Sequence, residues 1–389
     1  MNIGRTIFSQ VIDHLPIKEF RKCVGRYQGD RYVKRFSCWD QFLSMAFAQL
    51  TYRDGLRDIE SCLQSVGGKL YHMGFRSEIK RSTLADANEL RDWRIYADFA
   101  QALITTARPL YAAEPLGVEL TNTVYALDAT TIELCLSLCP WATFRRRSGA
   151  MKIETQLDLR GSIPTVVHVV PGSVNEIELL DHVIPEPGAI YLMDRGFIDY
   201  TRFLRLTTAG SFFVVRAKRD LRCVRVYSHP VDRTTGLRSD HTIRLTGPRT
   251  RFAYPGHLRR VRFIDPVEHT TLIFLTNQFS FPALTIAALY KLRWQVELFF
   301  KWIKQHLCIR AFYGTSLNAV TTQVWIALSV YVLVAIVKKR LGVALPLYTI
   351  LQILSVTLFE KVSLAHLLTT FRLGDQPSAF INQLSLFEL

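Results

Sequence analysis

The chain has 389 residues, of which 49% are hydrophobic and 12% aromatic. This composition excludes a disordered chain and a small scaffold held together by disulfides, and the length predicts two or three domains. The formal net charge of +15 favours a polyanionic partner, either nucleic acid or an anionic membrane surface.

The cysteines and the N-terminus bear on the cellular setting. The seven cysteines are odd in number and scattered, and the first residues lack the long apolar core of a secretion signal. Both observations predict a reducing, cytoplasmic environment. Cys135 and Cys139 are four residues apart, but no second Cys or His pair stands at zinc-finger spacing, so we interpret them as ordinary thiols.

Residues 1–118 are predicted to form a helical N-terminal domain. Apolar side chains recur there at helical spacing, first in Phe42 and Met45 and again in Ile95 and Phe99. No alternation typical of strands interrupts them.

Two short helices are expected within this domain, over residues 53–63 and 82–91, the second capped by Ser82 or Thr83. Together they are compatible with a helix-turn-helix-like reader of DNA. The alternative is a small helical bundle with a charged outer face, because the segment between the two helices is too long for a tight turn. The sequence leaves both interpretations open.

From about Val124 the pattern changes to that of an α/β domain. Strands are predicted at 123–135, 154–162 and 164–173, then a helix at 175–184, a strand at 189–194, a helix at 201–210 and a strand at 211–218. Turn signals separate the first three strands at the spacing of an antiparallel meander. Three strands followed by alternating helices and strands is the order of a ribonuclease-H-like sheet, although many mixed α/β folds share part of it.

Residues 219–270 are predicted to form a basic, β-rich insertion. Between Arg202 and Arg262 the chain has 15 Lys or Arg, nearly all Arg, against three Asp, so most of the net charge lies between these two residues, chiefly in the insertion and the segment just before it. Arginine is suited to bidentate phosphate contacts, and the interleaved Phe252 and Tyr254 are typical of surfaces that hold a nucleic-acid backbone. The alternative is a solvated basic face without a partner, which self-repulsion at this charge density disfavours.

A strand at 270–277 is expected to lead into a long helix from Leu284 to about His306, and further helices fill a C-terminal region, 316–389. The apolar run from Val324 to Val337 raises the question of a membrane span. Its 14 residues fall short of the roughly 20 that a helix needs to cross a bilayer. We interpret it as a buried core helix and expect no membrane association.

Two aspartates lie in predicted apolar strands, where a charged side chain is unexpected. Asp128 follows apolar residues within its strand, and Asp194 ends the strand at 189–194. Each alone is equally compatible with a capped or salt-bridged structural role. As a pair in neighbouring strands they would repel each other unless cations lay between them, which indicates a site for a hard metal ion.

The helix from Leu284 places a set of polar residues on one stripe. At about 100° per residue, Tyr290, Arg293, Glu297, Lys301 and Lys304 share one face, and apolar residues occupy the other sides. One carboxylate among basic side chains is typical of a groove with a single metal ligand and several phosphate contacts. The alternative is an exposed helix face on which Glu297 pairs with Arg293 or Lys301.

These residues resemble a known family. Tyr290, Arg293, Glu297 and Lys304 reproduce the Y-x2-R-x3-E-x6-K signature of bacterial insertion-sequence transposases, the family called insertion sequence four within the DDE superfamily. With Asp128 and Asp194 upstream, all three family motifs are present in the right order, over roughly residues 120–310. The resemblance implies a transposase with Asp128, Asp194 and Glu297 as catalytic metal ligands.

The resemblance also implies the architecture, the cofactors and the partners. It implies a ribonuclease-H-like catalytic domain at 119–218 and 271–315, a β insertion before the Glu-bearing helix, and an N-terminal region that binds DNA. Two Mg²⁺ ions, with Mn²⁺ as a substitute, are expected, together with double-stranded DNA and a homodimer that pairs two transposon ends. A cut-and-paste reaction through a DNA hairpin with a flipped base is usual in such relatives, and the expected location is cytoplasmic, with the nucleoid.

Several further residues are assigned to DNA. By similarity these are Tyr290, Arg293 and Lys304, to which the helical stripe adds Lys301. Phosphate contacts are also expected from the loop predicted after the first strand, through Arg145, Arg146, Arg147 and Lys152. Trp294 or Trp302 is a candidate to stack the flipped base, although large aromatics on a helix more often belong to the core.

Two other functions fit the same residues. One is an inactive or co-opted DNA-binding protein of the same fold, and the other is a ribonuclease-H-like nuclease that cuts without joining ends. The intact set of acids argues against decay of the site.

Overall fold

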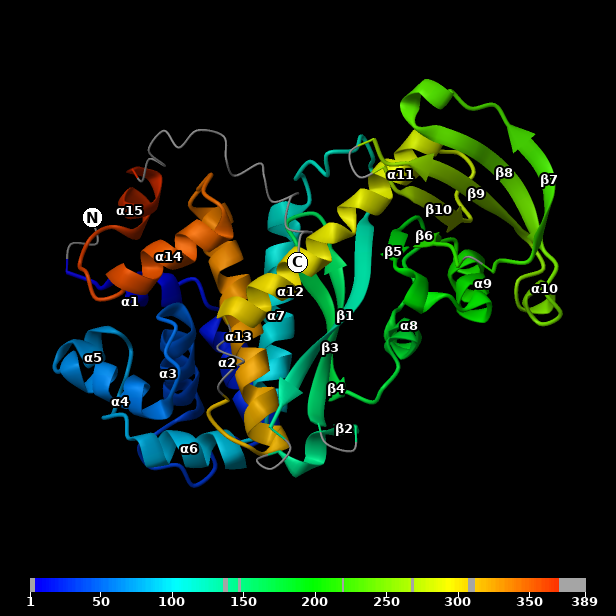
Figure 1. The fold of residues 1–389 in the computed structure, drawn as a ribbon. Helices are drawn as coiled ribbons and strands as arrows, with labels where there is room; N and C mark the ends of the chain where they lie inside the picture. Colours follow the sequence, from blue (N-terminus) through cyan, green and yellow to red (C-terminus); the bar gives the residue numbers. More distant parts are fainter. Residues whose placement is uncertain are drawn as a thin grey trace.

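The computed structural model describes residues 4–135, 139–145, 148–218, 220–266, 269–306 and 312–370. It combines a body of helices with one long mixed sheet that carries its own helices (Figure 1). The mixed α/β class and the helical N-terminal region predicted from the sequence are confirmed.

The helical body is built from both ends of the chain. Its N-terminal members are α1 (Ile7–Ile12), α2 (Ile17–Arg26), α3 (Cys38–Leu50), α4 (Leu56–Ser65), α5 (Lys69–His72), α6 (Arg81–Leu90) and α7 (Arg94–Tyr111), and its C-terminal members are α13 (Leu317–Arg340), α14 (Leu347–Thr357) and α15 (Leu364–Thr370). Hydrogen bonds join the two ends, since the Ile7 N–H donates to Glu360 O and the Gln10 side chain donates to Val362 O.

Helix α13 is the core of this body. Every residue from Ala319 to Val337 is buried, and the helix packs against α7, α3 and α6. It is long and apolar enough to cross a membrane by length and composition, but its apolar window is entirely buried inside the protein. The core-helix interpretation is confirmed, and the helix, with 24 residues, extends beyond the apolar run of 14 on which the interpretation is based.

The two short N-terminal helices are present as α4 and α6, with α5 between them. The predicted cap at Ser82 or Thr83 is wrong, because α6 begins at Arg81 after Lys80, whose side chain makes no capping hydrogen bond. Instead, the Arg81 N–H donates to Glu60 Oε1 of α4 at 3.0 Å. Tertiary contact between the two helices thus satisfies a main-chain donor that a local cap would otherwise satisfy.

The sheet runs through most of the remaining chain. Its strands are β1 (Val124–Leu134), β2 (Thr143–Arg145), β3 (Ser148–Asp158), β4 (Ile163–Pro171), β5 (Ile190–Met193), β6 (Phe212–Arg216), β7 (Cys223–His229), β8 (Leu237–Leu245), β9 (His257–Ile264) and β10 (Thr271–Thr276). Their order is β2-β3-β1-β5-β6-β10-β9-β8-β7, with β4 paired to β3. The meander of β1, β3 and β4 is antiparallel, and β1, β5 and β6 are parallel, as the predicted element order requires. The sequence did not predict β2.

Short helices cover the face of the sheet beside β5 and β6. They are α8 (Leu179–His182), α9 (Tyr200–Thr208) and α10 (Thr250–Ala253), and a 3₁₀ turn, Glu176–Glu178, leads into α8. Leu179, Phe203 and Phe213 are fully buried in the core that these elements form with the sheet.

The basic insertion continues the sheet. Strands β7, β8 and β9 join the parallel strands through β10, and Figure 1 shows them as the upper right end of the sheet. Arg259 and Asp240 form a buried ion pair at 2.7 Å, and Arg259 also donates to the carbonyl oxygens of Gln278 and Phe281. The insertion is therefore tied to the segment that leads directly into the next helix.

The helix expected from Leu284 to His306 is two helices. They are α11 (Ala283–Leu292) and α12 (Trp294–His306), and they run diagonally from the insertion strands to the helical body in Figure 1. Arg293 stands at the junction, where its N–H donates to Tyr290 O and its own carbonyl accepts from the Val296 N–H. These bonds span three residues rather than four, so the backbone tightens locally at Arg293.

Candidate active site

Two of the predicted acids come from adjacent parallel strands. The parallel ladder between β1 and β5 pairs Ala126 with Leu192, and Asp128 and Asp194 each lie two residues further along their chains. Parallel strands end at the same edge of a sheet, so the register brings these two carboxylates to one place. This is the arrangement that the sequence predicted for the pair.

Asp128 is nearly buried, with 17% of its side chain exposed. Its Oδ1 accepts the Ala129 N–H at 2.8 Å, and its Oδ2 accepts from Arg293 Nη1 at 3.2 Å. The pKa of Asp128 is raised to about 6, chiefly by burial. The Arg293 guanidinium opposes this rise, and the charges of Asp194 and Glu297 contribute to it. Asp194 and Glu297 are thus close enough to Asp128 to act on its pKa.

The third acid reaches the same place from α12, which packs against β1. Glu297 Oε1 accepts a hydrogen bond from Arg293 Nη2, so the guanidinium bridges Glu297 and Asp128. Arg293 is itself nearly buried, with 15% of its side chain exposed. The stripe predicted from the helical periodicity therefore turns inward at Arg293, toward the acids.

Asp194 lies at the end of β5 and begins a short 3₁₀ turn, Arg195–Phe197. Its Oδ1 accepts the Gly196 N–H at 2.7 Å. A Cβ on Gly196 would lie 2.3 Å from Glu176 Oε1 and 2.9 Å from Asp194 Oδ1. Glu176 is thus a fourth carboxylate next to the site, which the sequence did not single out, since no spacing pattern links it to the other acids.

Among the other residues assigned to DNA, Tyr290 is packed against the sheet, whereas Lys301 and Lys304 are exposed. The Tyr290 ring packs against Phe274 with centroids 4.8 Å apart, and the Arg293 guanidinium lies 5.7 Å from its centroid. Lys301 and Lys304 are exposed further along α12. The basic side chains of α12 therefore continue from the acids onto the protein surface.

The two tryptophans of α12 differ as well. Trp302 packs edge-on against Tyr331 at 4.5 Å, as a core aromatic does, whereas Trp294 is 41% exposed. Only Trp294 thus presents a large part of its ring to a ligand.

The residues expected in a loop after the first strand lie elsewhere. Lys152 belongs to β3, and its Nζ donates to Val174 O. Arg145 ends β2, and Arg146 and Arg147 lie outside the described residues. The expectation of one loop is wrong because strand β3 begins at Ser148, before Lys152.

The donor set fits a hard divalent cation in its chemistry. Carboxylate oxygens are the ligands that Mg²⁺ and Mn²⁺ prefer, and the charge around Asp128 would be relieved by a cation. As the described residues are placed, no three His, Cys, Asp or Glu stand close enough to hold an ion together. Arg293 explains this, because it pairs with two of the three acids at once.

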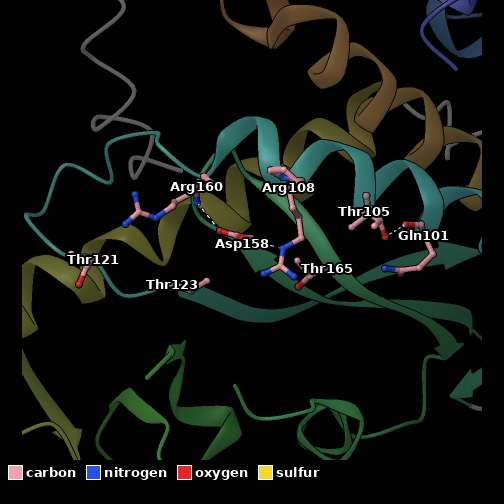
Figure 2. Close-up of a pocket in the computed structure, with 11 residues that line it drawn as sticks. Gln101, Thr105, Arg108, Thr121, Thr123, Asp158, Arg160 and Thr165 are labelled. Carbon is pink, nitrogen blue, oxygen red and sulfur yellow. Dashed lines mark hydrogen bonds and ion pairs between the residues drawn. The ribbon is translucent and has the colours of Figure 1, made fainter. Parts of the chain in front are cut away.

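A polar pocket of about 520 Å³ lies away from these acids, between α7 and the strands (Figure 2). Arg108 in this pocket is held by Asp158 and Tyr125, and Arg160 donates to the carbonyl oxygens of Glu114 and Leu120. The two guanidinium groups are thus engaged by the protein itself, and the pocket contains none of the predicted site residues.

Comparison with known proteins identifies relatives. Residues 119–333 match the family described as "Transposase DDE domain", and residues 3–76 match a "Domain of unknown function", DUF4372. The chain is 34% identical over 243 residues to a transposase, y4zB, of Sinorhizobium fredii, which covers 61% of this chain and 67% of that protein. It is 26% identical over 230 residues to the transposase for insertion sequence element IS5377 of Geobacillus stearothermophilus, covering 59% of this chain and 58% of that protein.

A solved structure is also similar, at a greater distance. It is the piggyBac transposase synaptic complex with hairpin DNA, with 10% sequence identity, a TM-score of 0.44 and coverage of 90% of this chain and 77% of that chain. A likeness at this level supports no argument.

The acids from two parallel strands and a helix, together with these relatives, define the class of protein as an enzyme, a transposase of the DDE type. The chain belongs to the transposase DDE domain family, which matches more than half of its length. Its named relatives are bacterial transposases, two of which are named for insertion sequence elements. Membership in this family also implies divalent metal ions.

Proposed function

We propose that the protein binds the ends of its insertion sequence, cleaves DNA there by metal-assisted phosphodiester hydrolysis and joins the 3′ ends to target DNA, by cut and paste through a hairpin. The observation that carries the proposal is the approach of Asp128 and Glu297 to one guanidinium, that of Arg293, beside Asp194. The catalytic core would be ribonuclease-H-like and comprise residues 119–218 and 271–315, with helical regions at 1–118 and 316–389.

Asp128, Asp194 and Glu297 would hold two Mg²⁺ ions, or Mn²⁺ in their place. When bound, such ions supply an anionic water nucleophile and stabilise the leaving oxygen. The partly buried setting of Asp128 limits access of bulk water, which strengthens electrostatic interactions inside the site.

The basic residues of α12 would hold the DNA end. Lys301 and Lys304 are exposed and free to meet phosphates at the surface, and Tyr290 would support the strand end through its ring. Arg293 would change partners, from the two carboxylates to a DNA phosphate, once other positive charge neutralises the acids. Arg145, Arg146, Arg147 and Lys152 stay proposals as further phosphate contacts.

The insertion, 219–270, would bind the DNA backbone outside the site. Its exposed arginines are Arg222, Arg225, Arg233, Arg238, Arg244, Arg249, Arg251 and Arg262. The Arg251 guanidinium lies over Phe252, a ring that is 72% exposed. An exposed aromatic beside arginines suits contact with a nucleic acid.

The assembly would be a homodimer that pairs two DNA ends, working in the cytoplasm at the nucleoid. The N-terminal helices would read the end sequence, in line with the likeness of this chain to transposases of insertion sequences.

The experiment uses the full chain, DNA carrying the ends of its element, and Mg²⁺. Cleavage at the ends followed by joining to a target supports the proposal. Binding without cleavage would indicate a DNA-binding protein of the same fold, and cutting that ignores the end sequence would indicate a nuclease. DNA with scrambled ends is the control, and reactions in EDTA separate metal-dependent cleavage from contamination.

A further inference from the structure

The carboxylates of Glu176 and Asp194 meet over a glycine. One point, the position of a Cβ on Gly196, lies 2.3 Å from Glu176 Oε1 and 2.9 Å from Asp194 Oδ1. Any side chain at residue 196 would have to displace Glu176. Because Gly196 has no side chain, the two carboxylates can approach each other. Repulsion between like charges destabilises a fold, so their proximity suggests that a bound cation compensates it.

No cation among the described residues pairs with Glu176. In the described part of the chain the Glu176 carboxylate has no ion pair and receives no hydrogen bond. The pKa of Glu176 is raised, chiefly by burial and secondly by the charge of Asp194. Lys152 is the basic residue that acts on the Glu176 pKa, but the Lys152 Nζ donates to the main-chain oxygen of Val174.

A buried acid faces the same group of charges. Glu154 is 1% exposed, and its Oε1 has no hydrogen-bond partner among the described residues. The charges that act on the Glu154 pKa are those of Lys152, Glu178 and Glu176. An unpartnered oxygen in a buried place costs free energy unless a bound group satisfies it.

We propose that Glu176 is a fourth carboxylate of the metal site, which binds a divalent cation together with Asp194. This inference rests on the proposed function, since it assumes that Asp194 is a metal ligand. Two divalent metal ions carry four positive charges, whereas Asp128, Asp194 and Glu297 supply three negative charges. Glu176 would supply the fourth. The charge of Glu176 also acts on the buried Glu154, so a cation bound by Glu176 would relieve the repulsion between these two acids.

The experiment measures Mn²⁺ binding to the full chain without DNA, by titration calorimetry and by the electron paramagnetic resonance signal of free Mn²⁺. E176Q is expected to weaken Mn²⁺ binding at one site at least tenfold, and E176D to restore part of it. E178Q is the matched control, because Glu178 is exposed on the same 3₁₀ turn, and its Mn²⁺ binding should equal that of the wild type.

The stability of E176Q without metal distinguishes a metal-binding role of Glu176 from a purely structural one. Because E176Q removes a repulsion with Asp194, its melting temperature in EDTA should equal or exceed that of the wild type, whereas loss of a structural contact would lower it. Equal Mn²⁺ binding by E176Q and wild type, with D128N weakened, would overturn the inference and leave the proposed function standing. If D128N and E297Q also bind Mn²⁺ like the wild type, the proposed function itself fails.

Discussion

Arg293 Nη1 donates to Asp128 Oδ2 at 3.2 Å, and the same guanidinium donates to Glu297. The residue that the family signature assigns to DNA is thus bound to two acids of the site in the protein alone. A guanidinium and a metal ion cannot both neutralise the same carboxylate oxygens, so the two should compete.

Arg293→Gln is expected to make the protein less stable without metal and more responsive to it. Breaking nearly buried ion pairs that leave acids uncompensated costs about 2 to 4 kcal/mol. The melting temperature in EDTA should fall, and the rise on adding Mn²⁺ should exceed that of the wild type. The control is Arg202→Gln, whose ion pairs with Asp181 and Asp199 lie outside the site. A smaller rise with Mn²⁺ in Arg293→Gln would show that Arg293 helps to hold the ion.

Glu297→Gln is expected to abolish cleavage and to leave DNA binding intact. The substitution keeps the size of the side chain but removes its charge, and loss of such a residue lowers the rate by roughly 10³-fold or more. Gel-shift assays with end DNA and cleavage assays with Mg²⁺ measure the two properties separately. Glu133→Gln, an exposed position on the strand of Asp128, should cleave at the wild-type rate. Retained cleavage by Glu297→Gln would remove Glu297 from the site.

Glu154 should make stability depend on pH. Burial raises the pKa of Glu154 to about 7 from an ordinary value of 4.5, so the folded protein binds this proton more tightly than the unfolded chain does. The stabilising effect is complete below pH 4.5 and is lost as the pH rises through 7. Glu154→Gln mimics the protonated acid, so at pH 8 it should be more stable than the wild type by about 1 to 2 kcal/mol, and equal to it near pH 4. Urea unfolding at both pH values measures the difference, and an equal difference at both would contradict the assignment.

Arg259→Ala should destabilise the protein more than any exposed arginine of the insertion. The Arg259–Asp240 pair is buried, with 7% and 4% of the two side chains exposed, and removing one partner of such a pair costs about 3 to 5 kcal/mol. The double variant Arg259→Met with Asp240→Leu should recover part of the loss. Denaturant unfolding measures both, and Arg238→Ala is the exposed control.

Arg225→Gln with Arg244→Gln should weaken DNA binding without regard to sequence. Both side chains are exposed on adjacent strands of the insertion. Each lost phosphate contact reduces the slope of log affinity against log salt by roughly 0.9. Fluorescence anisotropy between low and high salt measures the slope, with Arg202→Gln as the control. An unchanged slope would place the DNA on another surface.

The sequence predicted the placement of Asp128 and Asp194 because both depend on local pattern. Each follows an apolar strand, and the parallel register brings them together once the order of strands is right. The element order of the sheet was predictable for the same reason. The composition of the insertion showed that it is rich in arginine. Composition does not show, however, that the strands of the insertion extend the main sheet.

Other features depend on contacts between distant segments. The break at Arg293 was not predictable, because Tyr290 to Glu297 contains no helix-breaking residue and the pairing with Asp128 crosses 165 positions of sequence. The early start of α13 was hidden by polar residues, which are satisfied by tertiary bonds from Asn318 to Asn88 O and from the Tyr313 N–H to Gln323. The proximity of Glu176 to Asp194 likewise arises only when the chain folds over Gly196.

The burial of α13 affects how this protein can evolve. The segment matched as a domain of unknown function, 3–76, includes α3, which encloses α13 from one side. A copy that lost this segment would expose the face of α13 that α3 covers, and such an apolar face in water favours aggregation. New end specificities should therefore arise by substitution on the outer surface of these helices, since exchange of the whole segment would uncover the core.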